Sequence, residues 1–423
     1  MTPRAKPLPV DALVALCVLN HVALSGGRVA VALHALRLGV PSLGLGLMLA
    51  PFALTSTLGA LPLGRCVDRI GARVPALAGM AIMSAGLAAS AWHPTLPVLV
   101  FAATAIGLGY TASLIALQSE LARDRDERTR ATGFARFAVG TAASGGFGPF
   151  LAGQCMAHGG ATAAFGVLAG VSFAAACGAT WSAGRLQSSA AARAERPLAR
   201  PALFSRAALS GLGALRRLML ADLLMAFAWN ANGFVVPLVA QREGWPDDTV
   251  GNLLGTFGIA VMLVRALPAA WRTRGGDWQA IRRAVLASGA VLALLPLLTG
   301  MPVPFVLEAV LGCGLGSSLP SVLALFEART PAGRRAEALG LRQAVLGFGA
   351  ATLPTTLGAL VAASGLVAAS LAFGGGLLGA GALIAPNHRL MRSRRRPAVG
   401  SIECPAAVHR PLPQHPDAES GTS

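Results

Sequence analysis

Long apolar runs separated by short polar segments follow one another from about residue 10 to residue 385. A bilayer core about 30 Å thick needs roughly 20 helical residues to cross it, and each run has about that length. The pattern therefore predicts an all-α membrane protein built from spanning helices. Twelve transmembrane helices are predicted, over residues 11–35, 42–62, 74–92, 95–119, 131–156, 162–183, 217–240, 249–270, 283–300, 303–326, 338–362 and 364–385.

Several of these runs contain proline, for example Pro51, Pro149 and Pro237. Proline disrupts helices in water, but in a membrane the neighbouring helices satisfy the backbone groups that it frees. The helix prediction therefore stands for these runs. A mean hydropathy of +0.62 and a hydrophobic content of 54% exceed what a soluble core needs, which excludes a soluble enzyme and makes membrane lipid the surrounding partner.

Positive charge is concentrated in alternate connections between the predicted spans. The formal net charge is +17, which alone would suit a nucleic-acid partner. Internal arginine-rich segments all follow an even-numbered span, at residues 65–73, 123–130, 185–217, 272–283 and 329–335. Only Arg37 and Arg242 lie in the opposite connections. This positive-inside asymmetry predicts that both termini are cytoplasmic and removes the reason to expect a nucleic-acid partner.

Two polar stretches divide the chain into parts. A basic, Ala- and Pro-rich stretch is predicted to be a cytoplasmic linker, and a polar, Pro-rich stretch to be a disordered cytoplasmic tail. The six cysteines are scattered without CxxC spacing, so no metal site, cofactor or disulfide is predicted. The predicted parts are a cytoplasmic N-terminus at 1–10, a six-helix bundle at 11–184, the linker at 185–216, a second six-helix bundle at 217–386 and the tail at 387–423.

The two halves of the chain resemble each other. The segment ERTRATGFARFAVG leads into the fifth span and RRAEALGLRQAVLG leads into the eleventh, with Arg136 and Arg342 at nearly matching places. Internal duplication of this kind is typical of secondary transporters, whose substrate site lies between the repeats.

The charged segment GRCVDRIGAR lies between the second and third predicted spans. Its residues Gly64, Asp68, Arg69, Gly71 and Arg73 match the pattern GxxxDRxGxR. Because of this segment, the twelve predicted spans and the basic linker, the chain resembles the major facilitator superfamily over about residues 11–385. The resemblance implies two pseudo-symmetric six-helix bundles, a working monomer and transport by alternating access.

We predict that this segment forms a loop that helps to gate the cytoplasmic side. Its two glycines allow a tight turn and close approach, and Asp68 is suited to a helix N-terminus. Arg73 is expected to pair with an acid that ends the fourth span, either Glu120 or Asp124. The resemblance implies that such a cluster closes the cytoplasmic side in one state, whereas the plainer interpretation is a basic loop that follows the positive-inside rule.

The fifth span contains the segment GTAASGGFGPFLAG, which starts at Gly140. It resembles the glycine-rich motif of the superfamily's antiporters, with Gly148, Pro149 and Gly153 matching. Pro149 favours a bend, and the small residues allow a neighbouring helix to approach closely. The motif favours exchange over uptake, and packing alone is the plainer interpretation. The fourth span has Ala103 near the place where proton-driven drug antiporters often carry a buried arginine.

The resemblance implies that the first, fourth, seventh and tenth spans line a central cavity. These spans carry polar residues, whereas the ninth and twelfth carry almost none, as expected for helices that face lipid. In the first span His21, Ser25 and Arg28 stand at i, i+4 and i+7 and so share one face of the helix. The residues predicted to line the substrate cavity are Asn20, His21, Ser25, Arg28, Thr104, Tyr110, Thr111, Trp229, Asn230 and Ser317.

Ionisable residues inside a membrane are costly and mark a pathway or an internal partner. Arg28 is the best placed to hold an anionic group of a substrate, although pairing with a neighbouring helix is the alternative. The candidates for carrying a coupling proton are the acids Asp222 and Glu308, together with His21. Each of the three also has a purely structural interpretation.

The predicted function is movement of a small molecule across the membrane as a secondary active transporter. Proton-coupled export of drugs or metabolites is the first hypothesis, uptake of a small organic anion the second, and a receptor that no longer transports the third. The sequence has no ATP-binding P-loop, HExxH motif or nucleophile elbow, so no enzyme is predicted. The use of arginine, with Lys6 the only lysine, suggests a GC-rich bacterial genome and hence the bacterial inner membrane.

Overall fold

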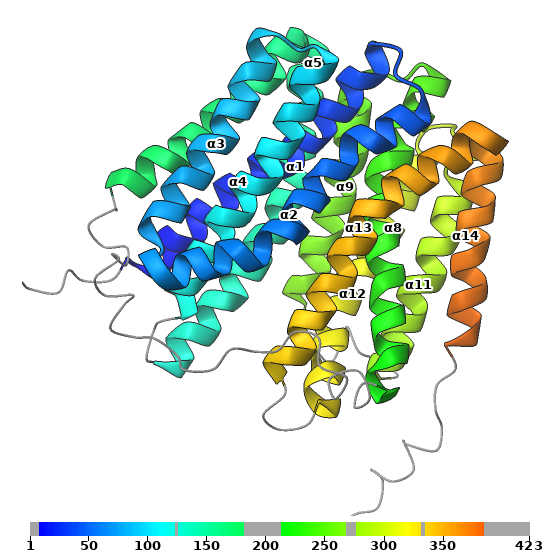
Figure 1. The fold of residues 1–423 in the computed structure, drawn as a ribbon. Helices are drawn as coiled ribbons and strands as arrows, with labels where there is room; N and C mark the ends of the chain where they lie inside the picture. The colour runs from blue at the N-terminus through cyan, green and yellow to red at the C-terminus, as the bar shows by residue number, and fades with distance from the viewer. Residues whose placement is uncertain (1–7, 123–125, 182–212, 268–275, 331–334, 385–423) are drawn as a thin grey trace, which may run out of the picture. The chain divides into compact units, whose positions relative to one another are not determined.

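The computed structural model describes residues 8–122, 126–181, 213–267, 276–330 and 335–384. Asp124, residues 1–7, almost all of the predicted linker and the predicted tail lie outside the described residues. Within the described part the secondary structure consists of helices, without a strand (Figure 1). They are α1 (Val10–Arg37), α2 (Ser42–Ile70), α3 (Arg73–Trp92), α4 (Leu96–Ala122), α5 (Glu127–Trp181), α8 (Gly213–Glu243), α9 (Asp247–Ala266), α11 (Asp277–Leu294), α12 (Val303–Arg329), α13 (Arg335–Ser364) and α14 (Leu366–Leu383).

Helix α5 consists of two helices joined at Gly160, where φ is 69° and ψ is −168°. Glycine adopts this conformation without the steric cost that a side chain brings. Each of the twelve predicted ranges overlaps one helix or one of the two parts of α5. Ten helices of the described residues are long and apolar enough to cross a membrane. The all-α membrane architecture is confirmed, and the count of twelve spans stays a prediction.

Two helix boundaries differ clearly from the predicted ones. Helix α2 continues to Ile70, so most of the predicted gating loop is helical and the turn to α3 is limited to Gly71 and Ala72. Helix α11 covers Asp277–Leu294 rather than residues 283–300. At the end of α2 and the start of α11 the prediction failed because hydropathy marks the apolar part of a helix, whereas backbone hydrogen bonds continue into polar residues. At the other end of α11 the apolar residues after Leu294, which include Pro296, form a turn and not helix.

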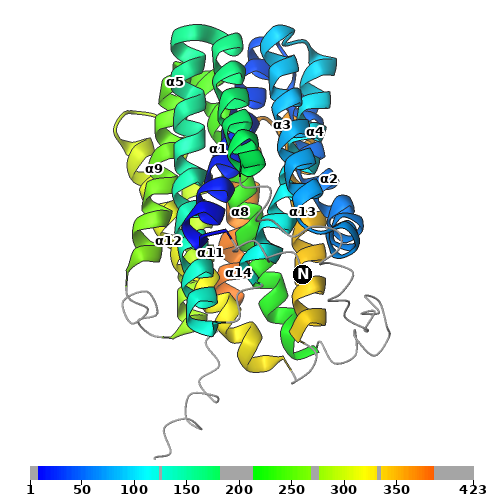
Figure 2. The same cartoon turned by 90° about the vertical axis from the view of Figure 1, so that its left-hand side faces the viewer.

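The two halves repeat one order of helix neighbours. In the first half, α1 to α5, helix α3 packs on α4 and α5, and α2 packs on α4. In the second half, α8 to α14, helix α11 packs on α12 and α14, and α9 packs on α12. The halves meet where α5 packs on α9 and where α2 packs on α13 (Figure 2). This repetition agrees with the internal duplication inferred from the sequence.

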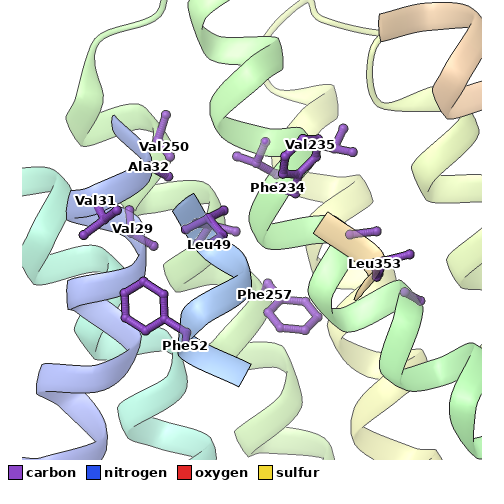
Figure 3. Close-up of a cluster of buried hydrophobic side chains, with 14 of the residues drawn as sticks. Val29, Val31, Ala32, Leu49, Phe52, Phe234, Val235, Val250, Phe257 and Leu353 are labelled. Carbon is purple, nitrogen blue, oxygen red and sulfur yellow. The ribbon is translucent and has the colours of Figure 1, made fainter. Parts of the chain in front are cut away.

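The largest hydrophobic cluster includes residues of both halves (Figure 3). It contains Val29 of α1 and Phe52 of α2, together with Phe234 of α8, Phe257 of α9 and Leu353 of α13. Burial of large apolar side chains from five helices therefore connects the halves through a shared core.

Glycines bring the backbones of the two halves into direct contact. A Cβ built on Gly258 of α9 would lie 2.1 Å from the Cα of Gly146 in α5, and one built on Gly153 would lie 2.6 Å from the Cα of Gly251. A Cβ built on Gly46 of α2 would lie 2.2 Å from a backbone oxygen of α13. No side chain fits at these points. The two seams between the halves, α5 against α9 and α2 against α13, therefore depend on small residues, as in many membrane helix pairs.

The helix ends form two groups, which we name by their connections. The hairpin end carries the turns from α1 to α2 and from α8 to α9, and the terminal end is where α1 begins and α14 ends. In Figure 1 the hairpin end is at the top of the view and the terminal end at the bottom.

Candidate functional site

A cavity of about 110 Å³ lies between the two halves. Five helices contribute to its wall, three from the first half and two from the second. The lining residues are His21, Leu24, Ser25, Arg28 and Val29 of α1, Leu49 of α2, Gly145 and Pro149 of α5, Trp229, Asn232 and Gly233 of α8, and Leu254 and Phe257 of α9. Because both halves form it, any movement of one half against the other changes this space.

Arg28 brings a positive charge into the cavity wall. Its Nη2 donates a hydrogen bond to Oδ1 of Asn230 in α8, with 3.1 Å between the atoms. Nδ2 of Asn230 donates to the carbonyl of Ala226 at 2.8 Å, which fixes the amide with its oxygen toward Arg28. Among the described residues no carboxylate forms an ion pair with Arg28. The partner of this guanidinium is therefore a neutral amide from the other half.

The polar face predicted on α1 is present and contacts α5. Nδ1 of His21 lies 2.8 Å from Oγ of Ser144, and the His21 ring is centred 5.6 Å from that of Tyr110. Oγ of Ser25 lies 2.9 Å from the carbonyl oxygen of Ser144. His21, Ser25 and Arg28 all line the cavity, as their i, i+4, i+7 spacing predicted.

Other residues predicted for the cavity lie outside its described lining. The hydroxyls of Thr104, Thr111 and Ser317 each donate to a carbonyl of their own helix. Asn20 donates to Oγ of Ser113 and so connects α1 to α4. The ring of Tyr110 is next to that of His21, and Tyr110 is not a lining residue. None of the described lining residues comes from α4 or α12, so the expected contribution of those helices is not made in this conformation.

A second polar group lies at the cavity wall on the side of the second half. Nδ2 of Asn232, a lining residue, donates to Oε2 of Glu308 in α12 at 2.8 Å. The exposed fractions of Asn232 and Glu308 are 1% and 0%. Trp229 and Phe257 form an apolar part of the same wall, with ring centres 4.8 Å apart in an edge-to-face arrangement. The predicted lining did not include Asn232 and Phe257, although Asn232 is a polar residue close to Trp229 in the predicted seventh span.

Asp222, the other embedded acid, is not among the lining residues. Arg342 of α13 donates to it twice, from Nε to Oδ2 at 2.6 Å and from Nη2 to Oδ1 at 3.3 Å. Arg342 is 9% exposed. The two residues form a buried ion pair between α8 and α13.

At the hairpin end several polar contacts join the halves. Arg37 of α1 forms an ion pair with Asp247 of α9. Nε2 of Gln241 in α8 donates to the carbonyl of Leu36 at 3.2 Å, and Oγ of Ser42 donates to the carbonyl of Gly358 in α13 at 3.1 Å. These contacts and the glycine seams close the hairpin end in this conformation. The sequence held one signal for them, since Arg37 is a rare basic residue on that side.

The predicted gating segment lies at the terminal end. Gly71 has φ of 82° and forms the predicted turn, but nothing lies within 4 Å of a Cβ built on Gly64, so no close approach occurs there. Asp68 and Arg69 lie in the last turn of α2, so Asp68 does not sit at a helix N-terminus. Arg73 is exposed, and its predicted ion pair with buried Glu120 is not formed within the described residues.

The antiporter-like residues lie where α5 meets both α1 and α9. A Cβ built on Gly140 would lie 2.6 Å from Val18 Cγ2, and one on Gly148 would lie 2.1 Å from Ser25 Oγ. Gly153 meets α9, and Pro149 lines the cavity. These residues let α5 pack tightly on one helix of each half, and helix α5 continues through Pro149.

A helical membrane protein with repeated halves, close seams between them and a polar cavity at their interface belongs by architecture to the transporters built from repeats. The sequence profile of the Major Facilitator Superfamily matches residues 14–307. The chain therefore belongs to this superfamily of transporters.

Solved structures of transporters have a similar fold. A POT family transporter in complex with 5-aminolevulinic acid matches with 14% identity and a TM-score of 0.70, over 89% of this chain and 95% of that one. A mutant of the peptide transporter POT in complex with sulfate matches with 16% identity and a TM-score of 0.72, over 93% and 96%. A mutant of the nucleoside transporter NupG matches with 15% identity and a TM-score of 0.70, over 89% and 99%. No curated protein sequence matches the chain significantly.

Proposed function

We propose that this transporter carries a small solute with an anionic group across the membrane by alternating access. The observation that carries the proposal is Arg28, which lines the cavity and bonds to the neutral amide of Asn230. A guanidinium has five N–H donors in a geometry that matches carboxylate and phosphate groups. A cation in a membrane interior is costly without a counter-charge, and a bound anion supplies one.

The size of the cavity favours a small metabolite over a drug. Its volume is about 110 Å³ in this conformation. A water molecule takes roughly 30 Å³ of the liquid, so the space corresponds to a few waters. Sites for drug-sized ligands occupy about 300 Å³ or more. Of the two substrate classes in the export hypothesis, metabolites therefore fit this space better.

For the direction of transport we propose export in exchange for protons. The support is the antiporter-like segment of α5, which packs against α9 at the seam between the halves. Glu308 is the candidate for the coupling proton, because it is fully buried beside the cavity and Asp222 is already paired with Arg342. The distribution of arginines supports an inner-membrane orientation with the terminal end in the cytoplasm. We propose a monomer as the working unit.

The binding test compares Arg28→Gln with a matched control, Arg136→Gln. Arg136 pairs with Asp11 at an exposed position and is not a lining residue. Apparent Tm of the detergent-solubilised protein is measured with acetate, propionate, butyrate and lactate. A ligand that binds the folded state raises Tm. We expect stabilisation of the wild type and of Arg136→Gln and none of Arg28→Gln, and equal stabilisation of all three contradicts the proposal.

The direction is tested with vesicles of both orientations. Uptake of the carboxylate that stabilises best is measured in inside-out and right-side-out vesicles with an imposed proton gradient. Export by exchange predicts accumulation in inside-out vesicles with an acidic lumen. Accumulation in right-side-out vesicles alone would establish the uptake alternative, and binding without transport in either orientation would favour the receptor.

A further inference from the structure

The cavity wall holds acceptor atoms that lack donors. Oδ1 of Asn232 and Oε1 of Glu308 are buried and have no hydrogen-bond partner among the described residues. Their companion atoms are bonded to each other, since Nδ2 of Asn232 donates to Oε2 of Glu308 at 2.8 Å. Buried polar atoms are nearly always hydrogen-bonded, so these two acceptors indicate that a donor is supplied there, either by a proton on Glu308 or by a ligand that meets the ionised carboxylate.

The donor that is missing must suit a carboxylate and an amide oxygen together. An ionised carboxylate in a membrane interior needs a counter-charge as well as hydrogen bonds. A primary ammonium group carries one positive charge and three N–H donors, enough for both acceptors. The cavity is the space next to these acceptors, because Asn232 is a lining residue and its Nδ2 is hydrogen-bonded to Glu308.

The same cavity therefore has two polar poles of opposite character. One pole is Arg28 with Asn230, which offers a cation whose other N–H groups have no acceptor among the described residues. The other is Asn232 with Glu308, which offers acceptors. Trp229 and Phe257 line the same cavity and offer apolar surface for a short carbon chain. A ligand that satisfies both poles has an anionic group, a short apolar segment and a primary ammonium group.

We infer that the solute is a small zwitterion of amino-acid type, whose anionic group binds Arg28 and whose primary ammonium group binds Glu308 and Asn232. The inference rests on the proposed function, because Arg28 holds the anionic end. In the absence of ligand, a proton on Glu308 supplies an O–H that can donate to Oδ1 of Asn232, so the empty site keeps both acceptors satisfied. Glu308→Gln reproduces this neutral form, with an N–H in place of the O–H.

The test uses pairs of ligands that differ only by the ammonium group. L-Alanine and β-alanine are each compared with propionate, and γ-aminobutyrate is compared with butyrate, by titration calorimetry on the full chain in detergent. Hydrogen bonds to charged groups predict that at least one zwitterion binds about 10- to 100-fold more tightly than its paired carboxylate. In Glu308→Gln we expect this advantage to disappear while the affinity for the carboxylate stays the same.

The control is Glu243→Gln, the same substitution at a residue that pairs with Arg242 at the hairpin end and is not a lining residue. It should keep the full advantage of the zwitterion. Equal binding of zwitterions and carboxylates to the wild type overturns the inference and leaves the anion proposal standing. An advantage that persists in Glu308→Gln also overturns it. If no carboxylate and no zwitterion binds, the proposed function fails as well.

If Glu308→Gln does not fold, the comparison of ligand pairs on the wild type still decides, and Asn232→Leu provides a second variant. This change removes the orphaned amide oxygen at the cavity wall and keeps a side chain of similar size. It should reduce the advantage of the zwitterion by about tenfold, with carboxylate binding retained. An undiminished advantage would place the ammonium group elsewhere and overturn the assignment.

Discussion

Neutralising Asp222 tests the ion pair that it forms with Arg342. The two side chains are 6% and 11% exposed, and two hydrogen bonds of 2.6 Å and 3.3 Å join them between α8 and α13. Arg342 also lies 5.9 Å from the centre of the Phe326 ring. The environment is therefore largely shielded from solvent on both sides of the pair.

The expected loss of unfolding free energy follows from the buried charge that is left unpaired after the substitution. Removing one partner of a buried ion pair leaves an uncompensated charge and costs about 3–5 kcal/mol. Asp222→Asn keeps an oxygen that accepts from Arg342, so we expect about 3 kcal/mol, the lower end of that range. Arg342→Gln should cost a similar amount because it strands the carboxylate. In the double variant both residues are neutral, and we expect a coupling energy of about 2 kcal/mol.

The assay is equilibrium unfolding by SDS in mixed micelles, applied to the four proteins of the double-mutant cycle. If the losses in unfolding free energy of the two single variants add up to that of the double variant to within about 0.5 kcal/mol, the coupling is refuted. Transport is measured alongside. If the ion pair has only a structural role, the double variant should transport like the wild type. Loss of proton coupling in that variant would instead make Asp222 the coupling residue.

Two further predictions concern the seams between the halves. Gly258→Val places a side chain where a Cβ would lie 2.1 Å from the backbone of α5, so we expect the free energy of unfolding in SDS to fall by about 1–3 kcal/mol. The control Gly376→Val, where nothing lies within 4 Å of a Cβ, should be nearly neutral. Equal losses in the two variants would contradict close packing at the seam between α5 and α9. Arg37→Gln removes the partly exposed ion pair with Asp247, worth about 0.2–1 kcal/mol. A cysteine replacing Ser25 in a cysteine-free background should then react up to about fivefold faster with an impermeant maleimide from the hairpin side, and an unchanged rate would show that this pair does not hold the end closed.

The helices could be predicted because the bilayer fixes both their length and their composition. Each apolar run overlaps a helix, and errors arose where polar residues extend a helix, as from Gly64 to Ile70 in α2. The cavity face of α1 could be predicted for a related reason. His21, Ser25 and Arg28 recur at helical spacing on one face, and a polar face of a membrane helix must meet protein or water.

The polar residues of α4 and α12 do not by themselves identify a cavity face, since a hydroxyl in a helix can bond to its own backbone. Thr111 donates to the carbonyl of Gly107 and Ser317 to that of Gly314, so neither hydroxyl needs a partner in the cavity.

The partner of Arg342 could not be predicted from the sequence. Asp222 is 120 positions away, and periodicity within one helix does not say which residue of another helix will lie opposite.

The contacts that close the hairpin end are few, which bears on how this transporter can move. Apart from the glycine seams, four polar contacts among the described residues join the halves there. They are the ion pair of Arg37 with Asp247, the hydrogen bonds of Gln241 and Ser42, and the hydrogen bond from Gln154 of α5 to Asn252 of α9. At about 0.2–1.5 kcal/mol each, these four contribute only a few kcal/mol. Glycine seams have no interlocking side chains to withdraw, so separating them costs less than unpacking large residues.

A ligand can supply a change of that size only if it binds the two states differently. Moving a two-state population from 1:99 to 99:1 takes about 5.5 kcal/mol of differential binding. Arg28 lies in α1, and its partner Asn230 lies in α8, so the distance between them changes when one half moves against the other. The proposed zwitterion would bridge Arg28 of α1 and Asn232 of α8, so it would bind one arrangement of the halves better than the other and would couple occupation of the cavity to closure of the hairpin end.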